Sequence, residues 1–305
     1  MATFASVTNK KLAKIPVTEL MLLMVAIFWG TSYGLTKEAL IFTSVFVFIA
    51  IRFSITFLCM LPVVIRDFRC GLNGDWMVAI PTGAVLSAIF FCEVYGVFHT
   101  SASNAAFLIS LSVVFTAFAE LVVNKRRVTN VLLVMTMTSV LGVLLLTSSK
   151  EGALVLNKGD CFILLAAVLR ALMVTLTKRV VEGKAITTST LTAVQSLVVA
   201  SIAIILAFIF QSSSEISMPN SLTFWLVMAY LVIFCTLFAF YVQNYAVRKT
   251  SPTRVSLLMG SEPLFGALFA VMWLNETLSL VQMIGGGLIF FSVIITSLWK
   301  EDVVV

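Results

Sequence analysis

Near its C-terminus the chain reads TSPTRVSLLMGSEPLFGALFAVMWLNETLSLVQMIGGGLIFFSVIIT, residues 250–296. Residues 100–146 follow the same plan 150 positions earlier and without a gap: a polar corner, an apolar run, a short polar loop and a second apolar run. The identical pairs at this offset include Leu108/Leu258, Phe115/Phe265, Ala117/Ala267, Val131/Val281 and Val143/Val293. The unbroken register indicates that one hairpin of two apolar segments is used twice.

The composition of the chain sets its class. Of the 305 residues, 60% are hydrophobic and only 11% are charged, and the mean hydropathy is +1.09. A soluble domain carries about 25% charged residues, so this chain has too little charge to cover a soluble surface. We therefore expect an integral membrane protein with the lipid bilayer around it. The net charge of +6 lies mostly in short loops, where Lys and Arg set orientation, and it does not indicate nucleic acid as a partner.

Apolar runs of about 20 residues, the length of a membrane-spanning helix, occur ten times along the chain. The expected spans are residues 17–36, 42–65, 76–98, 102–123, 128–147, 159–180, 188–210, 222–245, 252–274 and 278–298. The loops between them are short, which leaves no room for a soluble domain. The fold class predicted from these runs is all-α, with ten transmembrane helices.

The positions of the basic residues predict the orientation. If the N-terminus is cytoplasmic, fifteen of the 20 Lys and Arg residues lie on the cytoplasmic side and three lie on the other side, while Arg52 and Arg170 fall within spans. Cytoplasmic loops of membrane proteins carry an excess of Lys and Arg. We therefore expect both ends of the chain to be cytoplasmic, and the membrane to be the inner membrane of a bacterium.

The 150-residue offset divides the chain into two repeats of five helices, residues 1–147 and residues 148–305. Because five is odd, the second repeat should enter the membrane upside down relative to the first. The loop charges agree, since the basic loop that begins at Lys125 falls inside and Glu276, at the matching place, falls outside. Inverted repeats are the architecture of many secondary transporters, which bind substrate near the midplane between the repeats.

Two ionisable residues lie at membrane depth, where charges are expensive and usually functional. Glu262 precedes Pro263, which should kink the ninth span; its carboxylate could bind a cation, a proton or a substrate amine, or could be a paired group that fixes helix packing. Arg170 lies at the middle of the sixth span, at a cost of about 2.5–3.5 kcal/mol. It should face either the carboxylate of a substrate or, in a structural ion pair, Glu93, Glu120 or Glu262.

Polar and aromatic residues of other spans are further candidates. Glu93 in the third span and Gln243 in the eighth are related by the 150-residue offset, which suits two alternating gates; side chains that snorkel to the interface are the alternative. Trp29 and Tyr33 lie too deep in the first span for headgroup contacts, and they either stack on a substrate or pack between helices. For Arg52 we favour the role of a structural partner.

Other motifs point to packing rather than chemistry. Gly30 and Gly34 are spaced to allow close approach of helices. His99 is the sole histidine and has no nearby carboxylate, and the five cysteines are scattered, so we expect no metal site and no disulfide framework. No spacing typical of a hydrolase occurs, so we expect no catalytic residues, no cofactor and no enzyme activity.

A family resemblance adds to these predictions. The residues that carry it are Trp29-Gly30, Lys37, Ser261-Glu262-Pro263, Leu274-Asn275-Glu276-Thr277-Leu278, Gln282 and Gly285. In these motifs the chain resembles the EamA-type transporters of the drug/metabolite transporter superfamily. The resemblance implies ten helices in two repeats, and a central cavity lined by the first, third, fourth, sixth, eighth and ninth helices. It also implies a carrier, commonly an exporter, of amino acids, other metabolites or drugs.

The sequence therefore predicts a secondary active transporter, favoured as an exporter, of small metabolites such as amino acids or of drug-like compounds. The residues expected to bind the substrate are Trp29, Tyr33, Arg170 and Glu262. Glu93 and Gln243 are expected to act as gates or in coupling, with proton coupling through Glu262 or Glu93 as a further hypothesis, in a monomer or a homodimer. The alternative is an integral membrane enzyme that acts on a lipid or isoprenoid substrate, although no paired acidic or histidine constellation supports it.

Overall fold

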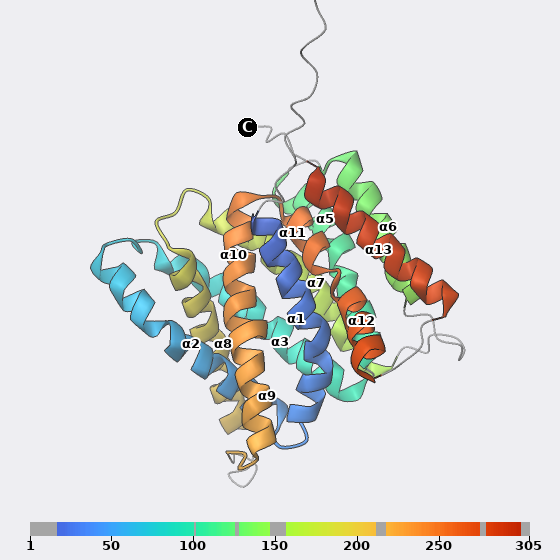
Figure 1. Cartoon of the computed structure of the whole chain (residues 1–305). Helices are drawn as coiled ribbons and strands as arrows, with labels where there is room; N and C mark the ends of the chain where they lie inside the picture. The colour runs from blue at the N-terminus through green and yellow to red at the C-terminus, as the bar shows by residue number, and fades with distance from the viewer. Residues whose placement is uncertain are drawn as a thin grey trace, which may run out of the picture.

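The computed structural model describes residues 17–100, 102–125, 128–146, 157–211, 218–274 and 279–299. Within these ranges the chain forms helices joined by turns and loops, with no strand (Figure 1). The helices are α1 (Val17–Ala39), α2 (Val45–Arg69), α3 (Ala79–His99), α4 (Ala102–Ser110), α5 (Ser112–Val123), α6 (Asn130–Leu146), α7 (Lys158–Val181), α8 (Thr188–Phe210), α9 (Leu222–Val232), α10 (Ala239–Lys249), α11 (Pro252–Met259), α12 (Glu262–Leu274) and α13 (Leu280–Leu298). A 3-10 turn (Trp76–Val78) precedes α3. Glu276 lies outside the described residues.

Eight segments of the described chain are helical, long and apolar enough to cross a membrane. They are Val17–Ala39, Val45–Arg69, Trp76–His99, Ala105–Val123, Lys158–Val181, Thr188–Phe210, Leu222–Lys249 and Leu280–Leu298. The other two expected spans are a helix of 17 residues, α6, and a segment that is divided between α11 and α12. The chain is thus an integral membrane protein that crosses the bilayer several times.

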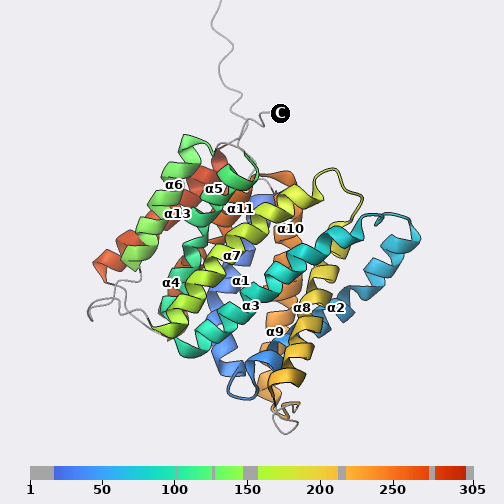
Figure 2. The same ribbon diagram turned by 180° about the vertical axis from the view of Figure 1, so that it is seen from behind.

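Two of the apolar segments are broken at related places. Leu111 separates α4 from α5, and Gly260 and Ser261 separate α11 from α12. Leu111 and Ser261 are related by the same 150-residue offset as the sequence pattern. Because α5 packs against α11 and α4 against α12, the two broken segments lie side by side and run in opposite directions. The view from behind shows α4 below α5 (Figure 2), and Figure 1 shows α12 below α11.

The expected kink at Pro263 is instead the start of a new helix. α11 ends at Met259, and Pro263 is the second residue of α12. A proline fits in the first turn of a helix, because an N–H there has no partner within the helix. The matching break at Leu111 occurs without a proline, so the prediction of one continuous helix kinked by Pro263 is wrong. The break leaves Glu262 as the first residue of α12.

Glycines bring two pairs of helices into backbone contact. A Cβ on Gly30 would lie 2.7 Å from the carbonyl oxygen of Glu262, so α1 and α12 touch at this point. A Cβ on Gly285 would lie 2.5 Å from the carbonyl oxygen of Gly142, which brings α13 against α6. A Cβ on Gly34 would meet nothing within 4 Å outside its own helix, so only Gly30 of the predicted pair supports close approach.

The main apolar core is built from residues of α1, α2, α3, α8, α9 and α10, with further residues from α7 and α11. Phe48, Phe53 and Phe224 have no exposed surface there. The ring of Phe53 meets that of Phe90 edge-on, with 4.5 Å between centroids. Aromatic contacts of this kind add to the hydrophobic gain and hold α2 and α3 in register.

The two described ends of the chain meet at one end of the bundle, through Arg254 at the start of α11. Its guanidinium donates to Oε1 of Glu19 at 2.7 Å. It also donates to the carbonyl oxygens of Trp299 at 2.6 Å and Ser297 at 3.2 Å. Arg254 is buried. The start of α1 and the end of α13 therefore lie at the same end of the bundle, as expected if both ends of the chain lie on one side of the membrane.

Candidate functional site

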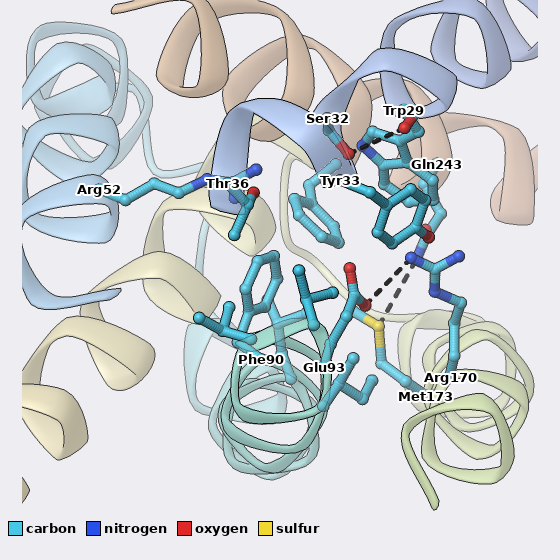
Figure 3. Close-up of a pocket in the computed structure, with 15 residues that line it drawn as sticks. Trp29, Ser32, Tyr33, Thr36, Arg52, Phe90, Glu93, Arg170, Met173 and Gln243 are labelled. Carbon is cyan, nitrogen blue, oxygen red and sulfur yellow. Dashed lines mark hydrogen bonds and ion pairs between the residues drawn. The ribbon is translucent and has the colours of Figure 1, made fainter. Parts of the chain in front are cut away.

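A small cavity lies inside the bundle, between helices from both halves of the chain (Figure 3). Residues of α1, α2, α3, α7 and α10 line it. Its polar lining residues are Ser32, Thr36, Arg52, Glu93, Arg170 and Gln243. The cavity volume is about 20 Å³, which is the space of roughly one water molecule. In this conformation the helices must separate before a metabolite can enter.

Arg170 of α7 binds two carboxylates at the cavity. Its Nη1 donates to Oε1 of Glu262 at 3.0 Å, and its Nη2 donates to Oε2 of Glu93 at 3.3 Å. The side chain of Glu262 has no exposed surface. Because an unpaired charge is expensive at this depth, the three side chains stabilise one another and the predicted pairing is confirmed. Glu120, the third partner considered, instead accepts hydrogen bonds from the N–H and the hydroxyl of Thr253.

Glu262 has one engaged oxygen and one free oxygen. Oε1 accepts from Arg170 and also from the hydroxyl of Tyr33, at 3.2 Å. Oε2 is buried and has no hydrogen-bond partner among the described residues. The position at the start of α12 favours a carboxylate, because the positive end of the helix dipole lies there. Glu262 can therefore take a proton or a further donor without leaving Arg170.

Trp29 of α1 is fixed between the ion pair and the turn that joins α9 to α10. The Cζ atom of Arg170 lies 4.5 Å from the centroid of the Trp29 ring, a distance typical of a cation–π contact. The indole N–H donates to the carbonyl oxygen of Cys235 at 2.9 Å. The ring is thus held in one orientation at the cavity wall.

The turn that joins α9 to α10 is π-helical, residues Ile233–Phe238, and turns of this kind are frequent at functional sites. Arg52 of α2 contacts it twice: Nε donates to Oγ1 of Thr236 at 2.6 Å, and Nη2 donates to the carbonyl oxygen of Cys235 at 3.4 Å. The Cζ atom of Arg52 also lies 5.2 Å from the ring centroid of Phe90. The expected structural role of Arg52 agrees with these contacts.

The structure brings the six predicted site residues together. Trp29, Tyr33, Glu93, Arg170 and Gln243 line the cavity, and Glu262 is bonded to two of them. Glu93 and Gln243 thus lie at one cavity, and their role as gates stays a prediction. Gln243 contacts Met173, with 3.5 Å between Nε2 and Sδ.

Several residues that line the cavity have no distinguishing feature in the sequence. The clearest cases are Phe90, Met173 and Phe240, which are ordinary members of apolar runs and carry no signal of their own. Arg52 did carry a signal, because it is a charge within a predicted span. Its place in the cavity wall nevertheless depends on how α2 packs, which no local pattern predicts.

The side chains of the site can bind a ligand through noncovalent contacts. Carboxylates bind amines, guanidinium groups bind carboxylates, and aromatic rings bind apolar groups. In the part of the chain that the structure describes, no group of three or more His, Cys, Asp or Glu side chains could hold a metal ion.

Comparison with known proteins gives three similarities. The model of the EamA-like transporter family matches residues 17–148 and residues 157–298. A curated protein of Archaeoglobus fulgidus named "Uncharacterized transporter" is 29% identical over 287 residues, which cover 92% of this chain and 85% of that protein. A solved crystal structure matches with a TM-score of 0.75, covering 91% of this chain and 95% of its own. The identity to that structure is 16%, so this likeness shows the fold alone.

Proposed function

The chain belongs to the EamA-like transporter family, and from this premise we propose that it is a secondary active carrier of small metabolites. The family and the relative named as a transporter point to a membrane transporter rather than an enzyme. The proposed substrates are amino acids and similar metabolites, or drug-like compounds. Transport runs by alternating access, in the direction of export, across the inner membrane of a bacterium.

The proposed carrier consists of two inverted repeats of five helices, residues 1–147 and residues 148–305. Two observations support this division. The family model matches once in each half of the chain. The segments broken at Leu111 and at Ser261 are related by the sequence offset and lie antiparallel. A solute passage then lies where the two repeats meet, as in other carriers built from inverted repeats.

The observation that best supports a carrier is the cavity between the two halves, with charges of both signs in and beside its wall. Charged side chains within a membrane are expensive, and they usually mark the path of a substrate or an ion. Trp29 and Tyr33 from the first half meet Arg170 and Glu262 from the second half at this place. In the proposal these four residues bind the substrate.

Coupling to protons is assigned in the proposal to Glu262. Its Oε2 atom is buried without a partner in the described part of the chain, so it is the place where a proton or a substrate amine would bind. The other titratable groups in contact with it are Tyr33 and Arg170, and Glu93 shares Arg170 with it. Transport that is indifferent to an imposed pH gradient would argue against this coupling.

Counterflow in liposomes tests the proposed function. The purified protein is reconstituted, the liposomes are loaded with one unlabelled compound, and entry of the same labelled compound is followed for amino acids, amines and purines. We expect exchange with the wild-type protein and a loss of about tenfold or more with Glu262→Gln, because a buried charged contact is removed. Glu38→Gln is the matched control, since Glu38 is exposed at the end of α1. Absence of exchange for the whole panel would contradict the proposal.

A further inference from the structure

Arg52 is a buried cation in the cavity wall that forms no direct ion pair with a carboxylate of the described residues. It is 4% exposed and lines the cavity together with Glu93. Glu93 and Glu262 are both bonded to Arg170, and Arg52 forms no ion pair with any of the described residues. A cation at this depth without a counter-ion is expensive. A carboxylate in direct contact with Arg52 would lower this cost.

The guanidinium of Arg52 is held in place with one nitrogen, Nη1, unused. Nε is fixed by Oγ1 of Thr236 at 2.6 Å, and Nη2 makes a long contact of 3.4 Å to the carbonyl oxygen of Cys235. Nη1 has no hydrogen-bond partner within the described ranges. Thr236 is itself held, because its hydroxyl donates to the carbonyl oxygen of Leu231 at 2.8 Å. A fixed guanidinium with a free nitrogen is a preorganised site for an anion.

We propose that Arg52 binds the carboxylate of the substrate, and that the substrate is a zwitterionic metabolite of the amino-acid type. The inference rests on the proposed carrier function and adds the chemical class that the cavity selects. The planar guanidinium matches the geometry of a carboxylate and can donate through two nitrogens. Figure 3 shows Arg52 and Arg170 reaching toward the cavity from opposite sides. When the helices separate to admit the substrate, its ammonium takes the Oε2 of Glu262, which is buried beside the cavity wall in this conformation.

The charges of the site favour a zwitterion over a simple amine or a simple acid. In their usual charged forms, Arg52 and Arg170 contribute two positive charges, and Glu93 and Glu262 contribute two negative charges. A zwitterion leaves this balance unchanged. An amine or an acid alone would add a net charge to a site with little water, which is unfavourable. The aromatic rings of the lining suit an apolar side chain on the substrate.

The test compares each amino acid with its amide, which keeps the amine and the side chain but lacks the carboxylate. Counterflow is measured for three pairs: L-leucine and L-leucinamide, L-methionine and L-methioninamide, and L-phenylalanine and L-phenylalaninamide. Leak through protein-free liposomes is subtracted. The proteins are the wild type, Arg52→Gln, Arg52→Lys and the matched control Arg66→Gln. Arg66 lies on the same helix outside the cavity, with its side chain 75% exposed.

In at least one pair, the wild type and Arg66→Gln should exchange the acid about tenfold or more faster than the amide. A difference of this size is the effect of one charge-assisted hydrogen bond to the carboxylate. Arg52→Gln should reduce this acid-to-amide ratio to about one to two. The variant loses the contact to the substrate carboxylate and keeps the contacts that the acid and the amide share. If Arg52→Gln slows the acid and the amide alike, the ratio stays unchanged and Arg52 is merely structural. A wild-type ratio near one, or no exchange within any pair, also overturns the inference.

A second variant and the other compounds of the panel distinguish the remaining outcomes. Should Arg52→Gln fail to fold, Arg52→Lys replaces it: a lysine keeps the charge but loses the two-nitrogen fork, so the ratio should fall by about threefold or more. An unchanged ratio in Arg52→Lys then overturns the inference. Exchange of amines or purines without exchange of amino acids would reject the role of Arg52 and retain the carrier, whereas a panel without any exchange would reject the carrier itself.

Discussion

At the scale of single residues, Arg170 is the cation that makes two carboxylates tolerable, one fully buried and one partly buried. In Arg170→Leu, Glu262 and Glu93 lose the ion pairs that they form with this cation. Removal of one partner from a buried ion pair costs about 3–5 kcal/mol, so we expect the free energy of unfolding to fall by about that amount. Thermal unfolding of the purified protein in detergent micelles measures the loss.

A second substitution separates this cause from a general packing defect. Addition of Glu262→Gln to Arg170→Leu removes one of the two uncompensated charges, so the double variant should be more stable than the single one. A double variant no more stable than Arg170→Leu would show that the carboxylates are not the source of the instability. Unchanged affinity of Arg170→Leu for an anionic substrate would separately remove Arg170 from the binding site.

The sequence identified several residues that the structure brings together at the cavity, while most of their contacts were not predictable. Arg170, Glu262 and Glu93 are found because a charge at membrane depth requires a partner. Arg52 carries the same signal, but its partners belong to a π-helical turn that nothing in the apolar run around Cys235 predicts. Contacts between helices far apart in the chain depend on packing, and a single sequence does not record them.

At the scale of the elements, the contact between α1 and α12 positions Glu262. A Cβ on Gly30 would lie 2.7 Å from the carbonyl oxygen of Glu262 and 2.8 Å from the N atom of Gly266, so Gly30→Ala must push α12 away from α1. Overpacking of this kind costs about 1–3 kcal/mol. We expect a lower unfolding temperature and weaker counterflow. Gly34→Ala, one turn further along α1, meets nothing within 4 Å and should change neither; equal effects would contradict the prediction.

The pair formed by α6 and α13 depends on a second glycine contact. A Cβ on Gly285 would lie 2.5 Å from the carbonyl oxygen of Gly142, whereas one on Gly287 would meet nothing within 4 Å. Gly285→Ala should therefore lower the free energy of unfolding by about 1–3 kcal/mol, and Gly287→Ala by much less. Both variants are compared by thermal unfolding. If Gly285→Ala proved as stable as Gly287→Ala, the two helices would not be in close contact.

The helical segments themselves were largely predictable, because hydropathy and length identify a membrane helix. The expected span 188–210 coincides with α8, and the expected span 159–180 differs from α7 by one residue at each end. The interruptions were harder to predict. The break at Leu111 falls in an apolar run without glycine or proline, whereas the other break lies just before Pro263. Tertiary packing decides where these helices stop.

At the scale of the whole molecule, composition alone predicts a membrane protein. A prediction of how the helices are arranged also requires the 150-residue repeat. One offset relates two stretches of sequence and two helix breaks, and it also relates Glu93 to Gln243, which share a cavity. The proposed duplicated unit would explain all three relations, provided that the second copy is inverted. The antiparallel packing of the broken segments supports that condition.

The inversion predicts the side of the membrane on which two matching loops lie. In a chain without its five native cysteines, single cysteines are introduced as Lys125→Cys and Glu276→Cys, 151 positions apart. A membrane-impermeant thiol reagent should reach the first from the cytoplasmic side only and the second from the outer side only, because an odd number of helices separates them. Reaction of both cysteines from one side would leave the repeats parallel. The cavity could then not open to each side by the same motion of related helices, and the proposed alternating access would lose its structural basis.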